Sequence, residues 1–268
     1  MAGMGPHSGE LRRAGFALIE LIIAVAMMAI LAAAMVPNIV AQLDRHREEA
    51  TRAEMAALYR AIVGEPENGV AGYLADMGRL PAGNSLAELI SQGSQPAHAL
   101  QTGAVAVGWS GPYVAGGFQG GDWLRDGWNH DYQFSSTTGQ ITSAGRDGSF
   151  SSADDLVMPA AAIRVTGTLS VMVQADSALV PGNTVVLDGG TARVYAYYSS
   201  DGSESSVELE WSGQAFQIPV GQPLPLGLHA VRVVGQDGGS KGDYSGRQVV
   251  ITAPLYGASS HVAAYLSP

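Results

Sequence analysis

The stretch that decides the fold is RRAGFALIELIIAVAMMAIL, residues 12–31, in which two arginines and a glycine precede an apolar run that extends to Val36. About 20 helical residues, at ~1.5 Å per residue, span the ~30 Å apolar core of a lipid bilayer. Arg12 and Arg13 flank the N-terminal end of the run, and the positive-inside rule places that end in the cytoplasm. We therefore expect a transmembrane helix over residues 16–36, with most of the chain exported.

The order of the segments around Gly15 differs from that of a secretory signal peptide. Such a peptide is cleaved after its apolar part, whereas here the small residue Gly15 precedes the apolar run. The run also contains Glu20, and a charge inside a membrane costs on the order of 2 to 3 kcal/mol, so it should have a partner or a purpose. An ordinary signal anchor with an incidental glutamate is the alternative interpretation.

The string from Arg12 onward resembles the class III leader of type IV prepilins, in which a glycine precedes a phenylalanine and a glutamate follows shortly. The resemblance implies that a prepilin peptidase cleaves between Gly15 and Phe16 and that the new Phe16 amine is N-methylated. It also implies that Glu20 pairs with the N-terminal amine of a neighbouring subunit, which neutralises a buried charge and sets the register of a filament. Residues 1–15 are then the leader, and residues 16–64 the N-terminal helix.

Beyond the apolar run, the sequence predicts that the helix continues to about Val63. Pro37 removes one backbone donor and is expected to kink or locally melt the helix. Glu48 and Arg52 stand four residues apart, where they can pair on an exposed side. Apolar residues recur at helical spacing and indicate a packed face: Leu43, Ala50, Ala53, Ala57, Leu58, Ala61 and Ile62.

The segment 65–158 contains strand-sized pieces bounded by glycines, at residues 109–114, 126–134 and 141–158. A short helix is expected around residues 86–90. The order of a GPY element, an Asp/Trp/Asn/Tyr strand and an SxGxDG…DD loop resembles the globular head of the major pseudopilins of type II secretion. This resemblance covers residues 12–158 and implies that the helix packs on a small sheet. His130 stands where related heads usually have glycine, and a packed or surface position is expected for it.

The loop over residues 144–156 carries the best candidate for a metal site. Asp147, Asp154 and Asp155 lie close in sequence, and Ser149 adds an oxygen. Calcium takes about six to eight oxygen ligands in a flexible loop, and the composition fits this demand without matching the EF-hand spacing. A solvated acidic turn fits the composition equally well. The resemblance to the pseudopilin calcium loop, with Asp147 and Asp155 at the positions whose side chains bind, favours calcium as a cofactor.

After a linker at residues 158–162, the sequence changes to short runs with period-two alternation, separated by turns such as Asp201-Gly202. About seven strands over ~100 residues predict a β-sandwich at residues 163–253. Part of it vaguely resembles transthyretin-like or carboxypeptidase-regulatory sandwiches, a fold that does not specify a function. Residues 254–268 form a C-terminal tail that either docks as a further strand or stays loose, and His229 is expected to pack inside.

Composition and motifs exclude several classes of function. The formal net charge of −10 argues against nucleic acid as a partner, because phosphate binding needs a basic surface. The absence of cysteine excludes disulfides, thiolate zinc sites and a cysteine nucleophile. We identify no HExxH, GxxxxGKS/T or GxGxxG motif and no GxSxG nucleophile elbow, and we do not expect an enzyme.

We therefore expect an α+β fold in which a long N-terminal helix, first transmembrane and then amphipathic, packs on a small antiparallel sheet and is followed by an all-β sandwich. The expected function is a structural subunit of a type IV pilus-like or type II secretion pseudopilus filament, a helical homopolymer of this chain. Its expected partners are prepilin peptidase, an assembly platform and other pilins or pseudopilins. The expected location is the bacterial inner membrane, with the C-terminus exported, and then a periplasmic pseudopilus or a cell-surface filament. The alternative is a minor pilin or membrane-tethered binding module whose sandwich recognises a carbohydrate or a protein.

Overall fold

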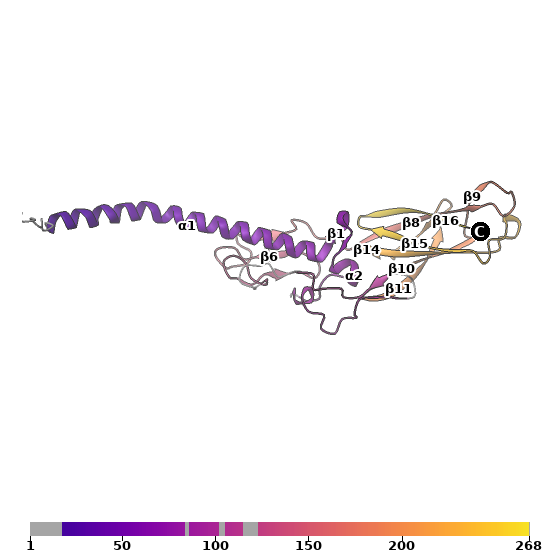
Figure 1. Cartoon of the computed structure of the whole chain (residues 1–268), viewed down its shortest axis with the longest axis horizontal. Helices are drawn as coiled ribbons and strands as arrows, with labels where there is room; N and C mark the ends of the chain where they lie inside the picture. The colour runs from indigo at the N-terminus through magenta and orange to yellow at the C-terminus, as the bar shows by residue number, and fades with distance from the viewer. Residues whose placement is uncertain (1–17, 84–85, 102–104, 115–122, 268) are drawn as a thin grey trace, which may run out of the picture. The chain divides into compact units, whose positions relative to one another are not determined.

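The computed structural model describes residues 18–83, 86–101, 105–114 and 123–267 (Figure 1). The leader, Gly15 and Phe16 lie outside the described residues. The chain divides into two compact units, Met1–Arg47 and Glu48–Pro268, and each is described by itself. The fold is α+β, as expected, with a long apolar N-terminal helix and a C-terminal part rich in β-strands.

The long helix α1 (Leu18–Val63) begins in the first unit and ends in the second. Alanine, leucine, methionine, glutamate and arginine, which have high helix propensity, make up much of it. Residue 37 is helical, so the local melting that Pro37 makes possible is not observed there. The helix ends at Gly64, whose φ of 82° is the left-handed conformation that commonly terminates helices and that glycine adopts without steric cost.

In the second unit, the last turns of α1 pack on a small antiparallel sheet of β5 (Gln133–Phe134), β6 (Ile141–Ser143) and β7 (Leu156–Met158). The buried positions of the helix are Thr51, Met55, Leu58, Ala61 and Ile62.

The packed stripe of α1 agrees only in part with the apolar stripe expected from the sequence. Leu58, Ala61 and Ile62 are buried, but Leu43 and Ala53 are exposed, and the polar Thr51 lies inside instead. Thr51 can be buried because its hydroxyl accepts a hydrogen bond from the Gly127 amide at 2.9 Å. The expected pair of Glu48 and Arg52 is confirmed, with an N–O distance of 2.7 Å.

The rest of this head region consists of short elements and loops. They are β1 (Gly64–Glu65), η1 (Pro66–Asn68), β2 (Val70–Ala71), α2 (Tyr73–Met77), η2 (Ala87–Leu89), β3 (Ala99–Leu100) and β4 (Ala106–Val107). The short helix expected near residues 86–90 is present as η2.

Two of the expected head strands are wrong in large part. Residues 109–114 form no strand, and only residues 133–134 of the segment 126–134 do. The Asp126 carboxylate explains the second case, because it accepts hydrogen bonds from the amides of Trp128 and His130 at 3.0 and 2.9 Å. Such local side-chain bonds compete with strand pairing and favour a turn.

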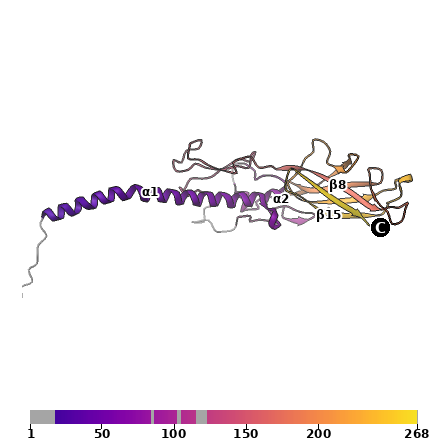
Figure 2. The same ribbon diagram turned by 90° about the horizontal axis from the view of Figure 1, so that it is seen from above.

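The C-terminal β domain contains β8 (Thr166–Asp176), β9 (Thr184–Val186), β10 (Ala192–Ser200), β11 (Ser203–Trp211), β12 (Phe216–Gln217), β13 (Leu224–Pro225), β14 (Gly227–Gly235), the single turn η4 (Gly239–Lys241), β15 (Gln248–Leu255) and β16 (Ser259–Leu266). The strand order is β13-β8-β12-β11-β10-β14-β15, and β9 and β16 pair with β8. Inward residues of β8 and β16 share one core with those of β10, β14 and β15. Figure 2 labels β8 and β15, which both contribute residues to this core.

The segment 254–268, for which docking and disorder were both open, supplies β16. This strand pairs along β8 from Ser259 opposite Thr168 to Leu266 opposite Ala175, and the pairing is parallel. Its alternation predicts the burial, since Ala264 and Leu266 enter the core while Tyr265 between them faces outward. The β domain therefore extends beyond residue 253, and it is not purely antiparallel.

The head and the β domain are joined by more than the linker. Leu74 of α2 belongs to the hydrophobic core of the β domain. The Ser199 hydroxyl of β10 donates to the backbone oxygen of Asp76 at 2.6 Å, and the Gly202 amide donates to the Met77 oxygen at 2.9 Å. The linker is itself fixed to the head, because the Ile163 amide donates to the Thr138 oxygen at 2.7 Å. These contacts explain why residues 48–268 form a single compact unit.

Candidate assembly helix and acidic loop

Glu20 lies in the first turn of α1 and is the only charged residue between Leu18 and Leu43. It is exposed, and so are the apolar side chains around it, with relative exposures of 67% for Ile19 and 60% for Leu21. The large apolar side chains further along remain exposed as far as Leu43, at 51%.

An exposed apolar helix of this length is unfavourable in water, because each Å² of apolar surface costs roughly 25 cal/mol. The helix α1 is long and apolar enough to cross a membrane. Either a bilayer or the same helices of neighbouring subunits can cover this surface. Within either apolar environment, the Glu20 carboxylate requires a positively charged or hydrogen-bonding partner.

The acidic loop between β6 and β7 folds around the Ser152 hydroxyl. The Ser152 Oγ lies 2.6 Å from an oxygen of Asp154, 3.1 Å from one of Asp155 and 3.4 Å from one of Asp147. Backbone amides bind the same carboxylates, with Ser149 N to Asp147 at 2.7 Å and Ser151 N to Asp155 at 2.7 Å. The loop thus brings together the three aspartates that the sequence proposes as ligands, while Ser149 contributes its amide.

The donor set of this loop consists of oxygens, which suits a hard cation such as calcium. One hydroxyl has a single proton, so Ser152 satisfies at most one of the three carboxylates at a time. The Ser152 hydroxyl and the backbone amides lower the pKa of Asp154 below its usual value. Among the described residues, however, no group of three acidic or histidine side chains has the arrangement of a complete metal site. Further ligands would have to come from backbone carbonyls, the serine hydroxyl or water.

Comparison with known families identifies the N-terminal segment. Residues 11–36 match the family described as "Prokaryotic N-terminal methylation motif". This match indicates a type IV prepilin-like protein. It covers the leader cleavage position at Gly15 and Phe16 as well as Glu20, and it supports cleavage by a prepilin peptidase. No curated protein and no solved structure matches the chain.

In this prepilin-like protein, the Asp126 carboxylate supports the acidic loop, a role that the sequence did not reveal. Besides the two amides of its turn, it accepts a hydrogen bond from the Ser143 hydroxyl at 2.5 Å, and its side chain is buried. Ser143 Oγ in turn accepts one from the Gly145 amide at 3.1 Å, which starts the acidic loop. The Asp-Gly at residues 126–127 signals a turn, but nothing in the sequence shows that this carboxylate supports a loop 20 residues away.

His130 contacts the acidic loop directly. Its Nδ1 lies 3.0 Å from the backbone oxygen of Gly145, so the imidazole donates this hydrogen bond. A Cβ built on Gly148, which has a φ of 68°, would lie 2.8 Å from the His130 Nε2. The expectation of a packed or surface histidine fits this position, and the positive φ of Gly148 favours glycine there.

His229 is buried in the β domain of the prepilin-like protein, where its Nδ1 lies 3.1 Å from the Gly227 oxygen. Burial lowers the pKa of His229 to about 4, so the ring is neutral at neutral pH. It packs beside Tyr198, with 6.4 Å between the ring centroids.

One string in the β domain has the letters of a nucleophile motif. Residues 238–242, GGSKG, have GxSxG spacing. They surround the single turn η4 and do not form the strand-to-helix turn that exposes a nucleophilic serine in hydrolases.

Proposed function

We propose that this chain is a structural subunit of a type IV pilus-like filament or a type II secretion pseudopilus. The observation that carries the proposal is the exposed apolar surface of α1 from Leu18 to Leu43, whose single charge, Glu20, lies within the matched N-methylation motif. Such a surface suits both a membrane and a bundle of identical helices. We also propose that the chain has no catalytic activity.

The assembly step follows from the chemistry of the cleaved N-terminus. Cleavage after Gly15 creates a new amine at Phe16, four residues before Glu20. In a bundle of apolar helices, this amine and the Glu20 carboxylate of a neighbour are each too costly to bury alone. Pairing between subunits offsets much of both costs and selects one axial register. Cleavage is therefore part of the polymerisation chemistry.

The location and partners belong to the same proposal. The subunit first crosses the bacterial inner membrane once, with its C-terminus exported, and then enters a periplasmic pseudopilus or a surface filament. Prepilin peptidase, an assembly platform and other pilins or pseudopilins are its partners. The head supports a pseudopilin-like origin through the order of its motifs, while the attached β domain is better suited to the outer surface of a fibre. Glu20 favours a position within the shaft over a position at the tip.

A second candidate is a minor pilin or membrane-tethered module whose β domain binds a carbohydrate or a protein. The β domain is firmly attached to the head by the α2 contacts, so a ligand bound to it would be held at a defined place on the subunit.

Calcium binding by the acidic loop is a further part of the proposal. Adding calcium to the purified full-length chain in detergent should raise its melting temperature, because a ligand that binds only the folded state stabilises it. A chelator should reverse the shift. The Asp147→Ala plus Asp155→Ala variant should show no shift, whereas Glu67→Ala plus Glu210→Ala, which removes the same charge from two exposed positions elsewhere, should retain it. A native chain that does not respond, or a shift that survives in the loop variant, would refute calcium binding.

The Glu20→Ala variant tests the filament proposal. Normal cleavage without filament assembly is the expected result.

A further inference from the structure

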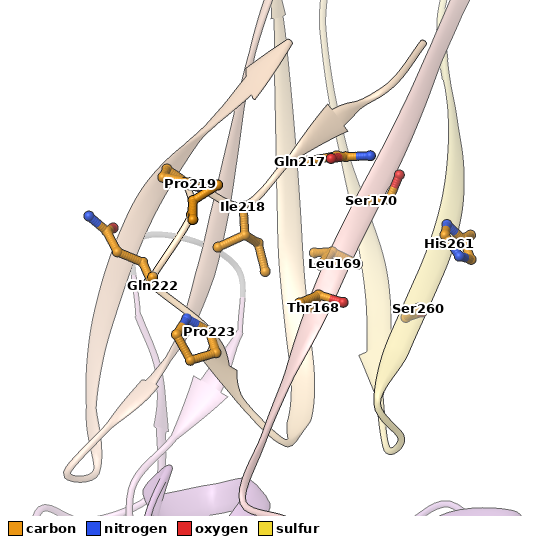
Figure 3. Close-up of a pocket in the computed structure, with 12 residues that line it drawn as sticks. Thr168, Leu169, Ser170, Gln217, Ile218, Pro219, Gln222, Pro223, Ser260 and His261 are labelled. Atoms are coloured by element: carbon orange, nitrogen blue, oxygen red, sulfur yellow. The ribbon is translucent and has the colours of Figure 1, made fainter. Parts of the chain in front are cut away.

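A cavity of about 400 Å³ opens on the outer face of the β domain (Figure 3). Its floor is formed by β8 and β16 and by the end of β12, and its wall by the loop that follows β12. Ligand pockets for small molecules begin at roughly 300 Å³, so the cavity is large enough for a small ligand.

A row of polar side chains crosses the floor of this cavity. Gln217 of β12 lies opposite Ser170 of β8, and His261 of β16 lies opposite the same serine from the other side. Figure 3 shows these three side chains on neighbouring strands. Because adjacent strands are ~4.8 Å apart, an amide, a hydroxyl and an imidazole are presented over about 10 Å.

These polar groups are available to a ligand. Within the described part of the chain, the side chains of Ser170, Gln217 and His261 have no hydrogen bond to another residue. The same holds for Gln222 and Ser260 at the margin of the cavity. Hydroxyl and amide side chains both donate and accept hydrogen bonds. A neutral imidazole donates through one ring nitrogen and accepts through the other.

The wall of the cavity is a short loop with restricted conformations. Pro219 and Pro223 have fixed φ angles, and the Gln222 amide donates to the Pro219 oxygen at 3.1 Å to close a turn. Ile218 and Pro219 add apolar surface beside the polar floor. A wall that is already ordered loses little conformational entropy when a ligand binds.

The lining also indicates what the ligand is not. None of the twelve described residues that line the cavity is an aspartate, glutamate, lysine or arginine. Phosphate, sulfate or carboxylate groups are usually bound through charge-assisted hydrogen bonds, so a charged ligand is disfavoured. An added peptide strand along β8 is also disfavoured, because β8 already pairs with β16 on one side and with β13 and β12 on the other.

We propose that this cavity binds an uncharged saccharide. Sugar hydroxyls donate and accept hydrogen bonds, as do the side chains of the floor, and the C–H faces of sugar rings suit the apolar wall. The binding site does not depend on the filament role, but it rests on the second candidate function, in which the β domain binds a ligand. It assigns a location and a ligand class to the β domain.

The test is the binding of the full-length chain to an array of neutral, sialylated and sulfated oligosaccharides. The chain is kept in an amine-oxide detergent, because maltoside detergents carry sugars. We expect binding to neutral glycans. The Gln217→Leu and His261→Leu variants should weaken it by about fivefold or more each, since a lost hydrogen bond is worth about 1 kcal/mol.

The matched control is Gln174→Leu, because Gln174 lies on the outer face of β8 but outside the cavity. Its affinity should remain that of the native chain. The proposal is overturned if the native chain binds no neutral glycan, binds only charged ones, or binds extended peptides instead. Equal affinities of the Gln217→Leu and Gln174→Leu variants would also overturn it. Filament assembly by Gln217→Leu should be normal, which separates this outcome from a failure of the filament proposal.

Discussion

Filaments should be almost absent when Glu20 is replaced by alanine, although the variant chain should still be cleaved and inserted into the membrane. The cleavage position at Gly15 and the apolar run are unchanged, so maturation should be normal. Assembly should fail because the Phe16 amine of each neighbour would be buried without its partner. Removing one member of a buried ion pair costs about 3 to 5 kcal/mol, which corresponds to more than about 100-fold in the association of each subunit. The measurement is the amount of this chain in sheared filaments relative to the mature chain in membranes.

Glu48→Ala is the matched control for Glu20. Glu48 lies on the same helix and forms a partly exposed pair with Arg52, at 2.7 Å. Such a pair contributes only about 0.3 to 0.5 kcal/mol, so the control should assemble like the native chain. Filaments of Glu20→Ala at the native level would show that the carboxylate has no part in assembly.

The Gly78→Ala variant should lose about 3 kcal/mol or more of unfolding free energy. Gly78 ends α2 with a φ of 71°, and a Cβ at this position would overlap the backbone carbonyl of Ser199 in the β domain. The left-handed conformation costs alanine about 1 kcal/mol, and overpacking adds about 1 to 3 kcal/mol. The displaced strand β10 also holds the hydrogen bond from Ser199 to Asp76. Denaturant unfolding of the full-length chain in detergent measures the loss.

Gly69→Ala separates the two contributions. Gly69 has a φ of 70°, close to that of Gly78, but nothing lies within 4 Å of the Cβ position. This variant should lose only about 1 kcal/mol. Equal losses in the two variants would mean that the head does not pack against the β domain at Gly78. If the Gly78→Ala chain does not accumulate, limited proteolysis replaces denaturant unfolding as the measurement. Cleavage between the head and the β domain should then be faster in Gly78→Ala than in Gly69→Ala.

Local patterns in the sequence predict much of this fold. The helix, its end near Val63, the Glu48–Arg52 pair and the alternating strands of the β domain all depend on residues close in the chain. Hydrophobic periodicity and charge spacing contain this information directly. The same holds for the acidic loop, whose aspartates are near neighbours in sequence and meet around Ser152.

The features that the sequence does not predict depend mostly on contacts between residues that are distant in the chain. Leu74 enters the core of the β domain, and Asp76 accepts a hydrogen bond from Ser199, 123 residues later. Asp126 turns a predicted strand into a loop because its carboxylate binds nearby amides, a competition that alternation alone does not reveal. The cavity on the outer face of the β domain is of the same kind, since Ser170, Gln217 and His261 meet only through strand register.

The N-terminus of the chain recovered from sheared filaments tests the central claim most directly. Intact-mass and N-terminal peptide measurements should find a chain that begins at Phe16 and carries one methyl group on its amine. That result would place cleavage, methylation and assembly on the same molecule. Filament material whose chain begins at Met1, or begins beyond the apolar run, would contradict the account.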